Sequence, residues 1–234
     1  MKIAILSDIH GNDYALEAVL AEAKKEHVEK LLILGDIVGY YYNVDKVIDK
    51  LSHWDFDIIK GNHELILEGL INKTIDQSSI QLKYGSGHFI AIEKPSKNQL
   101  SWLINLPENK HIEINGCKIL MCHGSPWSVN SYIYPNTPKT LIEMCDSEAA
   151  DIVFIGHTHY PFFLKNNNSL LINCGSVGQA RNKGGQANWC LLNTENGAIQ
   201  LNSTNYDTSK LKSEILNIDP SNSYLIEILD RNTK

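Results

Sequence analysis

"KIAILSDIHGND" (residues 2–13) joins a strand-like apolar run to polar residues that are costly to bury. Its first five residues have the length and the branched side chains of a buried strand. Asp8 and His10 follow at the carboxyl end, where a carboxylate and an imidazole need compensating partners once they lose water. Asn12 is expected to cap a helix over residues 13–27, whose apolar positions form one stripe. The stretch therefore predicts the first strand and helix of a β-α-β unit.

Apolar runs of similar length recur along the chain, and their branched residues and terminal glycines favour strands over helices. These runs are KLLILG (30–35), FDIIKG (56–61), KILMC (118–122), DIVFIG (151–156) and SLLINCG (169–175). A helix predicted over residues 44–51 would extend a parallel sheet, whereas Asn115-Gly116 predicts a hairpin over 111–122. Two more hairpins are predicted over 162–173 and 189–201. We expect an α/β fold in which two packed sheets of mixed strands carry outer helices.

The length of 234 residues predicts one domain, and a composition of 43% apolar and 21% charged residues is typical of a globular protein. Within this single domain, residues 1–234, we expect a mainly helical, cap-like insertion at about 64–109 and a C-terminal extension at about 203–234. The formal net charge of −6 offers no basic patch, which argues against nucleic-acid binding.

The five cysteines lack CxxC spacing, which predicts reduced thiols and a reducing compartment. The N-terminal apolar run is too short for a signal peptide or a membrane span. We therefore expect a cytoplasmic protein without a membrane partner. The sequence leaves the oligomeric state open.

Side chains that could bind a metal follow five of the predicted strands, at the point where each strand ends. They are Asp8, His10, Asp36, Asn62, His123, His157 and His159. One such residue is usually a turn or capping residue, but these motifs pair each donor with a glycine that allows close backbone approach. Because strand carboxyl ends line one crevice in an open α/β sheet, we expect the donors to converge. Oxygen and nitrogen donors suit Mn²⁺, Fe²⁺, Co²⁺ or Zn²⁺. Because these donors are too many for one ion, they predict two ions that share a carboxylate.

Six motifs resemble those of the calcineurin-like metallophosphoesterase superfamily, in the family's order, and most closely its small bacterial and archaeal phosphodiesterase branch. They are SDIHGN (7–12), GDIVG (35–39), GNHE (61–64), HGSP (123–126), GHTHYP (156–161) and NCGSVGQAR (173–181). The resemblance implies a four-layer α/β/β/α sandwich that holds two divalent metal ions. We expect Mn²⁺, with Fe²⁺, Co²⁺, Ni²⁺ and Zn²⁺ as alternatives.

The resemblance also assigns roles to single residues. The first ion would take Asp8, His10, Asp36 and His159, and the second Asp36, Asn62, His123 and His157, with Asp36 as the bridge. His63 matches the family histidine that contacts the substrate phosphate. The sequence leaves open whether His63 is a general acid or an uncharged hydrogen-bond donor. A hydroxide between the cations would attack phosphorus in line with the leaving group.

Gly39 and Tyr40 depart from the Asp-Arg pair that protein phosphatases of this superfamily carry after the second metal motif. The carboxylate that would orient His63 is therefore missing, as is the arginine that would clamp a phosphate. This departure favours a diester or an anhydride over a phosphoprotein as substrate. Asn12, Tyr40 and Arg181 are the residues that we expect to contact the substrate.

The loop over residues 173–181 has two interpretations. The backbone N–H groups of Gly175, Ser176 and Gly178 could bind an anion, or the loop only turns the chain. Four histidines lack any motif and are expected at the surface or in hairpins, namely His27, His53, His88 and His111.

Together these features predict a dinuclear metal-dependent phosphodiesterase, an enzyme that acts on a small phosphorylated or nucleotide-type substrate. Hydrolysis of a dinucleoside polyphosphate or another phosphoanhydride is the first alternative, and phosphomonoester hydrolysis is the second. A non-catalytic scaffold protein is the alternative from another class, since a fold alone does not prove activity. Retention of all the metal and histidine positions favours the enzyme.

Overall fold

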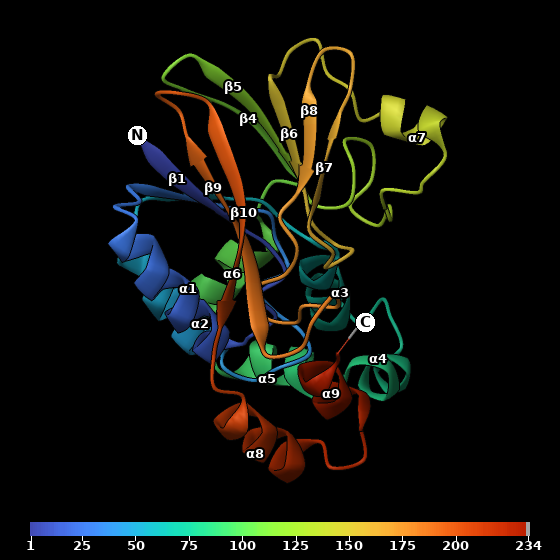
Figure 1. Cartoon of the computed structure of the whole chain (residues 1–234). Coiled ribbons are helices and arrows are strands. Elements are labelled where there is room, and N and C mark those ends of the chain that lie inside the picture. Colours follow the sequence, from blue (N-terminus) through green and yellow to red (C-terminus); the bar gives the residue numbers. More distant parts are fainter. Residues whose placement is uncertain (233–234) are drawn as a thin grey trace.

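Two five-stranded β-sheets face each other in the structure, a computed structural model that describes residues 1–232 (Figure 1). Sheet A has the order β10-β9-β1-β2-β3 and contains β1 (Lys2–Leu6), β2 (Lys30–Ile33), β3 (Phe56–Ile58), β9 (Gln186–Asn193) and β10 (Ala198–Asn205). Sheet B has the order β4-β5-β6-β8-β7 and contains β4 (Asn109–Ile114), β5 (Cys117–Cys122), β6 (Ile152–Ile155), β7 (Phe162–Lys165) and β8 (Leu170–Asn173). Both sheets mix parallel and antiparallel pairs.

Helices cover the outer face of sheet A and one end of the sandwich. The first two, α1 (Asp13–Lys25) and α2 (Val44–Ser52), lie side by side against sheet A (Figure 1). Four helices separate β3 from β4, namely α3 (Asn62–Ile71), α4 (Gln77–Tyr84), α5 (Gly87–Glu93) and α6 (Lys97–Ile104). The others are α7 (Lys139–Glu143), which lies beside sheet B, and α8 (Ser209–Ile218) and α9 (Tyr224–Glu227), which follow β10.

The alternation of side chains along β1 builds two layers of core at once. Ile3 and Ile5 point into the apolar space between the sheets. Ala4 and Leu6 point to the other face and belong to the core beneath the outer helices. Because both faces of this central strand are buried, its sequence is continuously apolar.

The predicted α/β sandwich of two mixed sheets with outer helices is confirmed, but its outer layers are unequal. Within residues 1–232, the cover of sheet B consists of the short helix α7 and the irregular chain around it. Val153 and Ile155 of β6 share a small core there with Ile133 and Cys145. The second helical layer implied by the resemblance is therefore much thinner than the first.

The three predicted hairpins are confirmed as β4–β5, β7–β8 and β9–β10, and β3 extends sheet A in parallel with β2. Helices α3 to α6 occupy most of the segment expected to be an insertion, while the domain boundaries themselves stay a prediction. The last two residues of the expected C-terminal extension, 233–234, lie outside the described residues. Over residues 1–232, every helix is too short or too polar to cross a bilayer.

Candidate metal centre

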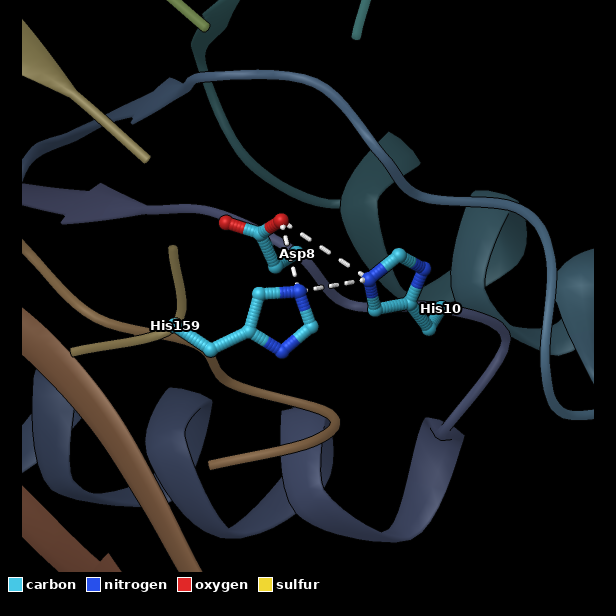
Figure 2. A group of neighbouring side chains, drawn as sticks. All are labelled: Asp8, His10 and His159. Atoms are coloured by element: carbon cyan, nitrogen blue, oxygen red, sulfur yellow. Dashed lines mark hydrogen bonds and ion pairs between the residues drawn. The ribbon is translucent and has the colours of Figure 1, made fainter. Parts of the chain in front are cut away.

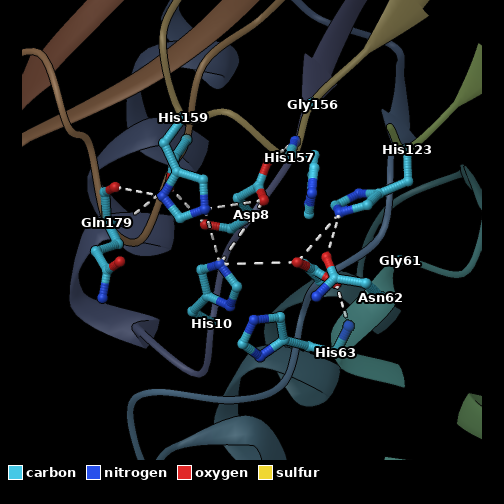
Figure 3. Close-up of polar contacts among 12 residues, drawn as sticks. Asp8, His10, Gly61, Asn62, His63, His123, Gly156, His157, His159 and Gln179 are labelled. Atoms are coloured by element: carbon cyan, nitrogen blue, oxygen red, sulfur yellow. Dashed lines mark hydrogen bonds and ion pairs between the residues drawn. The ribbon is translucent and has the colours of Figure 1, made fainter. Parts of the chain in front are cut away.

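The seven predicted donor side chains come together where five strands end. Figure 3 labels all of them except Asp36. Sheet A supplies those after β1, β2 and β3, namely Asp8, His10, Asp36 and Asn62. Sheet B supplies those after β5 and β6, namely His123, His157 and His159. All seven side chains are buried. The site therefore lies at the seam between the two sheets.

Asp8, His10 and His159 form the first group of donors (Figure 2). The Nε2 atoms of His10 and His159 lie 3.3 Å apart, and Oδ1 of Asp8 lies 3.7 Å and 3.2 Å from them. Nδ1 of His10 donates to the Val38 carbonyl at 2.9 Å, and Nδ1 of His159 donates to the Gln179 carbonyl at 2.6 Å. In neutral rings both Nε2 atoms then carry lone pairs, so that three acceptors face one another. A cation at their centre resolves this conflict.

Asp36, His123 and His157 form the second group, with Asn62 beside them. Nε2 of His123 lies 3.2 Å from Oδ2 of Asp36 and 3.0 Å from Oδ1 of Asn62. Nε2 of His157 is buried and has no hydrogen-bond partner among the described residues. Nδ1 of His123 donates to the Leu34 carbonyl at 2.7 Å, which directs Nε2 toward the other donors. These atoms require a positive charge between them, either a proton on His123 or a metal ion.

Asp36 faces both groups. Its Oδ2 lies 3.9 Å from Nε2 of His10, in addition to its contact with His123. Its Oδ1 accepts a hydrogen bond of 2.7 Å from the backbone N–H of His63. The position agrees with the bridging role that the resemblance implies. His63 also comes close enough to Asp36 and His10 to form a third donor group with them.

Five of the seven donors have a left-handed backbone, a conformation that is unfavourable for residues other than glycine. The φ angles are 54° at Asp8, 51° at His10, 53° at Asp36, 64° at His157 and 63° at His159. Each such residue costs on the order of 1–2 kcal/mol, so the surrounding structure must enforce the conformation. Strain of this kind concentrates at functional sites, which supports a functional role for this cluster.

Glu64 fixes the backbone around Asp36. Its Oε1 accepts the N–H groups of Ile37 at 2.9 Å and Val38 at 3.3 Å, and its Oε2 accepts those of Asp36 and Gly61, both at 2.8 Å. Burial and the Asp36 carboxylate raise the pKa of Glu64 to about 7, although the N–H donors act in the opposite direction. A Cβ atom at Gly61 would lie 2.2 Å from Oδ1 of Asp36, so only glycine fits there.

Burial and neighbouring charges also shift the pKa values of the histidines. Burial and the His159 ring lower the pKa of His10 well below its usual range, and burial lowers that of His157 to about 3. Neutral imidazoles of this kind are ready to bind a metal. Although burial acts against it, the Asp36 carboxylate raises the pKa of His123 to about 10.

A cavity of about 110 Å³ opens above the donors, and His63 lines it. Arg181 also lines it, and the Nε atom of this guanidinium is buried without a hydrogen-bond partner in the described structure. The Tyr40 ring packs on His10 and His63, with centroids 4.7 Å and 5.0 Å away. Tyr40 and Arg181 therefore both lie at this cavity, and their contact with a substrate stays a prediction.

Three residues of the cavity wall were missed by the sequence analysis. Lys83 and Tyr84 come from α4, and Tyr132 comes from the loop after β5. The Nζ atom of Lys83 lies 4.8 Å from the centre of the Tyr84 ring. No motif marks these residues, and the expected cap over 64–109 was the one sign of a contribution from α4.

The structure gives Asn12 a different place from the one expected. It is fully buried, its Oδ1 caps α1 through the Ala15 N–H, and its Nδ2 donates to the Gly178 carbonyl and to the Tyr206 hydroxyl. Both N–H bonds are thus used within the protein, which leaves none for a substrate. The expected substrate contact by Asn12 is therefore not supported.

The loop over residues 173–181 turns the chain instead of presenting a row of N–H groups. The Gly178 N–H donates to the Asp8 carbonyl at 2.9 Å, and the Gly175 N–H donates to Asn173 at 2.9 Å.

The expectation that His88 lies at the surface or in a hairpin is wrong, because its side chain is fully buried. His27, His53 and His111 are exposed, as expected.

Fold and site together define an α/β/β/α protein with a candidate dinuclear metal centre between its sheets. Residues 1–197 match the calcineurin-like phosphoesterase superfamily domain, and the chain belongs to this metal-dependent superfamily, as the motifs predicted. It is 30% identical over 233 residues to the uncharacterized protein MJ0912 of Methanocaldococcus jannaschii, covering 92% of this chain and 91% of that one.

Two solved structures share the whole fold at 23% identity. The hypothetical protein PH1004 from Pyrococcus horikoshii OT3 has a TM-score of 0.82 and covers 100% of this chain and 99% of its own. A metallophosphoesterase from Sphaerobacter thermophilus has a TM-score of 0.79, with 97% and 98% covered. At this level of identity the likeness extends to the fold alone.

Proposed function

We propose that this chain is a dinuclear metal-dependent phosphodiesterase. One observation carries the proposal: His10 and His159 direct their Nε2 atoms toward each other and toward the Asp8 carboxylate, an arrangement that a cation stabilises. Asp36 lies between this group and the second one, so two cations would share its carboxylate. Mn²⁺ is the metal that we expect, with Fe²⁺, Co²⁺, Ni²⁺ and Zn²⁺ as alternatives.

Bound cations would supply Lewis acidity at phosphoryl oxygens and lower the pKa of a water between them. The protein's own residues bind and orient the substrate. Arg181 has a buried N–H without an acceptor, which a phosphoryl oxygen would provide. Lys83 adds a second positive charge at the cavity. His63 contacts the substrate beside the donors, where low water content strengthens each hydrogen bond.

The preference for a diester rests on what surrounds the cavity. Gly39 and Tyr40 replace the Asp-Arg pair of protein phosphatases, so the site depends less on clamping a dianionic monoester. Rings of Tyr40, Tyr84 and Tyr132 line the cavity. Aromatic rings of this kind stack on a base or an aryl group, which the second ester of a diester would carry.

A phosphoanhydride hydrolase acting on a dinucleoside polyphosphate is the second candidate. Lys83 and Arg181 favour it, because a polyphosphate carries more negative charge than a diester. Phosphomonoester hydrolysis ranks third. A non-catalytic scaffold protein of this fold stays the alternative from another class, and the complete donor set with His63 argues against it.

A substrate panel tests these candidates. The protein is stripped with a chelator, reloaded with Mn²⁺, and assayed on bis-nitrophenyl phosphate, nitrophenyl phosphate and a dinucleoside tetraphosphate. We expect a higher kcat/KM for the diester than for the monoester. A monoester preference of tenfold or more, about 1.4 kcal/mol in barrier, would refute the diesterase. Fastest cleavage of the anhydride would favour the second candidate, and no hydrolysis with any metal would favour the scaffold.

A further inference from the structure

His88 is a buried polar residue that the proposed reaction does not yet use. It lies near the start of α5 and has no exposed surface. Its Nε2 atom lies 3.0 Å from Nδ1 of His63, and the planes of the two rings differ by only 13°. This geometry is that of a hydrogen bond between two imidazoles. Nε2 is then the only nitrogen of His63 left free for a substrate.

Two glycines make room for this pair of rings. A Cβ atom at Gly39 would lie 2.1 Å from Nδ1 of His63, and a Cβ atom at Gly87 would lie 2.7 Å from the Tyr40 backbone. Gly39 stands where the resemblance places the orienting carboxylate of protein phosphatases. The chain therefore has no side chain at position 39, and α5 brings His88 to the same nitrogen of His63.

The direction of the hydrogen bond follows from the far side of His88. Its Nδ1 is buried and has no hydrogen-bond partner in the described structure. If His63 were the donor, the proton of His88 would sit on this Nδ1 as an unpaired buried N–H. If His88 is the donor, only a lone pair stays unpaired, which is the more tolerable defect. In the second arrangement His63 also presents an N–H, rather than a lone pair, to the oxygens of an anionic substrate.

We propose that His88 is a positioning residue that donates its Nε2–H to His63 and so fixes the Nε2–H tautomer of His63. His63 then acts on the substrate as an uncharged hydrogen-bond donor. A carboxylate partner would stabilise an imidazolium, which can release a proton, whereas a neutral histidine partner does not. The catalytic consequence rests on the proposed function, but the tautomer is a property of the folded protein alone.

Nitrogen NMR of the full chain tests the tautomer without any activity measurement. The histidines carry ¹⁵N, Zn²⁺ serves as a diamagnetic metal, and His63→Gln identifies the His63 signals. We expect His63 to be protonated at Nε2 in the wild type and in His88→Gln, whose amide can still donate. His88→Leu should lose this preference, and His111→Leu, at an exposed hairpin position, should keep it. Protonation at Nδ1 in the wild type, or no change in His88→Leu, would overturn the proposal.

Kinetics test the consequence. His88→Leu should lower kcat by about 10²-fold, as expected for a misplaced catalytic group, with KM and metal content nearly unchanged. His88→Gln should retain most of the wild-type kcat. The loss of rate in His63→Ala should be equal for good and poor leaving groups. A loss that grows for poorer leaving groups would mean proton transfer and would overturn the neutral-donor role. If the wild type hydrolyses no phosphoester, the proposed function fails, while the NMR experiment still decides the tautomer.

Discussion

Replacing Glu64 with glutamine tests how the backbone around Asp36, the proposed bridging carboxylate, is held. The carboxylate accepts four backbone N–H groups, two on each oxygen. Glutamine keeps one oxygen and turns an NH₂ group toward the other two donors, which lose their acceptor. Each buried N–H left unpaired costs about 1–3 kcal/mol, which gives about 2–6 kcal/mol for two.

We expect the stability loss of Glu64→Gln to fall in the lower half of this range. Burial and the Asp36 carboxylate raise the pKa of Glu64 to about 7, so the charged form of Glu64 carries a cost that a neutral glutamine does not. We expect a loss of about 2–3 kcal/mol in the free energy of unfolding, or about 5–10 °C in Tm for a chain of this size. Metal affinity should fall by about 10–100-fold, as for other groups that orient a ligand.

Urea unfolding of the metal-free protein measures the first effect, and calorimetric titration with Mn²⁺ measures the second. Glu68→Gln is the matched control, because Glu68 lies one turn further along α3 and makes a partly exposed ion pair with Lys60 at 3.1 Å. Its loss should stay below about 1 kcal/mol. If both variants lose the same stability and bind Mn²⁺ equally well, Glu64 does not hold the Asp36 backbone and our account of it is wrong.

Three further predictions concern single residues. Asp36→Asn should lose both metal ions by elemental analysis, whereas Asp49→Asn, exposed on α2, should keep them; two ions retained in the first would refute the bridge. Lys83→Ala should raise KM for anionic substrates by up to about tenfold with little change in kcat, whereas Lys97→Ala, at an exposed position, should leave KM unchanged. Equal KM values for the two variants would exclude a substrate contact by Lys83. Gly39→Ala should lower kcat by about 10²-fold, because the added Cβ would collide with His63. Gly116→Ala is the control, since Gly116 has a similar φ of 79° but open space around it, and it should lose only about 1 kcal/mol of stability. Equal kcat values for the two variants would refute the collision.

The donors of the centre could be predicted from the sequence because strand polarity fixes where they lie. Asp8 and Asp36 follow the parallel strands β1 and β2 of sheet A, and His123 and His157 follow the parallel strands β5 and β6 of sheet B. Parallel strands of one sheet end at the same edge, so each sheet brings its own donors together. The apolar runs fixed the strands themselves, and the Asn115-Gly116 turn fixed one hairpin.

Residues brought in by helix packing could not be predicted in this way. His88 reaches His63 only because Gly87 lets α5 lie against the Tyr40 backbone, a contact between segments that share no local pattern. Lys83 depends likewise on how α4 is placed. Asn12 was expected to contact the substrate because it lies in a motif near the donors. Its side chain instead caps α1 and binds the Gly178 carbonyl.

The seam between the sheets has a consequence for when during translation this protein can acquire its metal. The first and second donor groups each combine residues that follow β1 or β2, which are made early, with histidines that follow β5 or β6 in sheet B. Even β1 gains its second neighbour, β9, only after about 180 further residues have been made. A ribosome-bound chain that stops short of His157 thus contains neither the first nor the second donor group in full. Metal binding at these groups therefore comes late, after both sheets have been made and packed together.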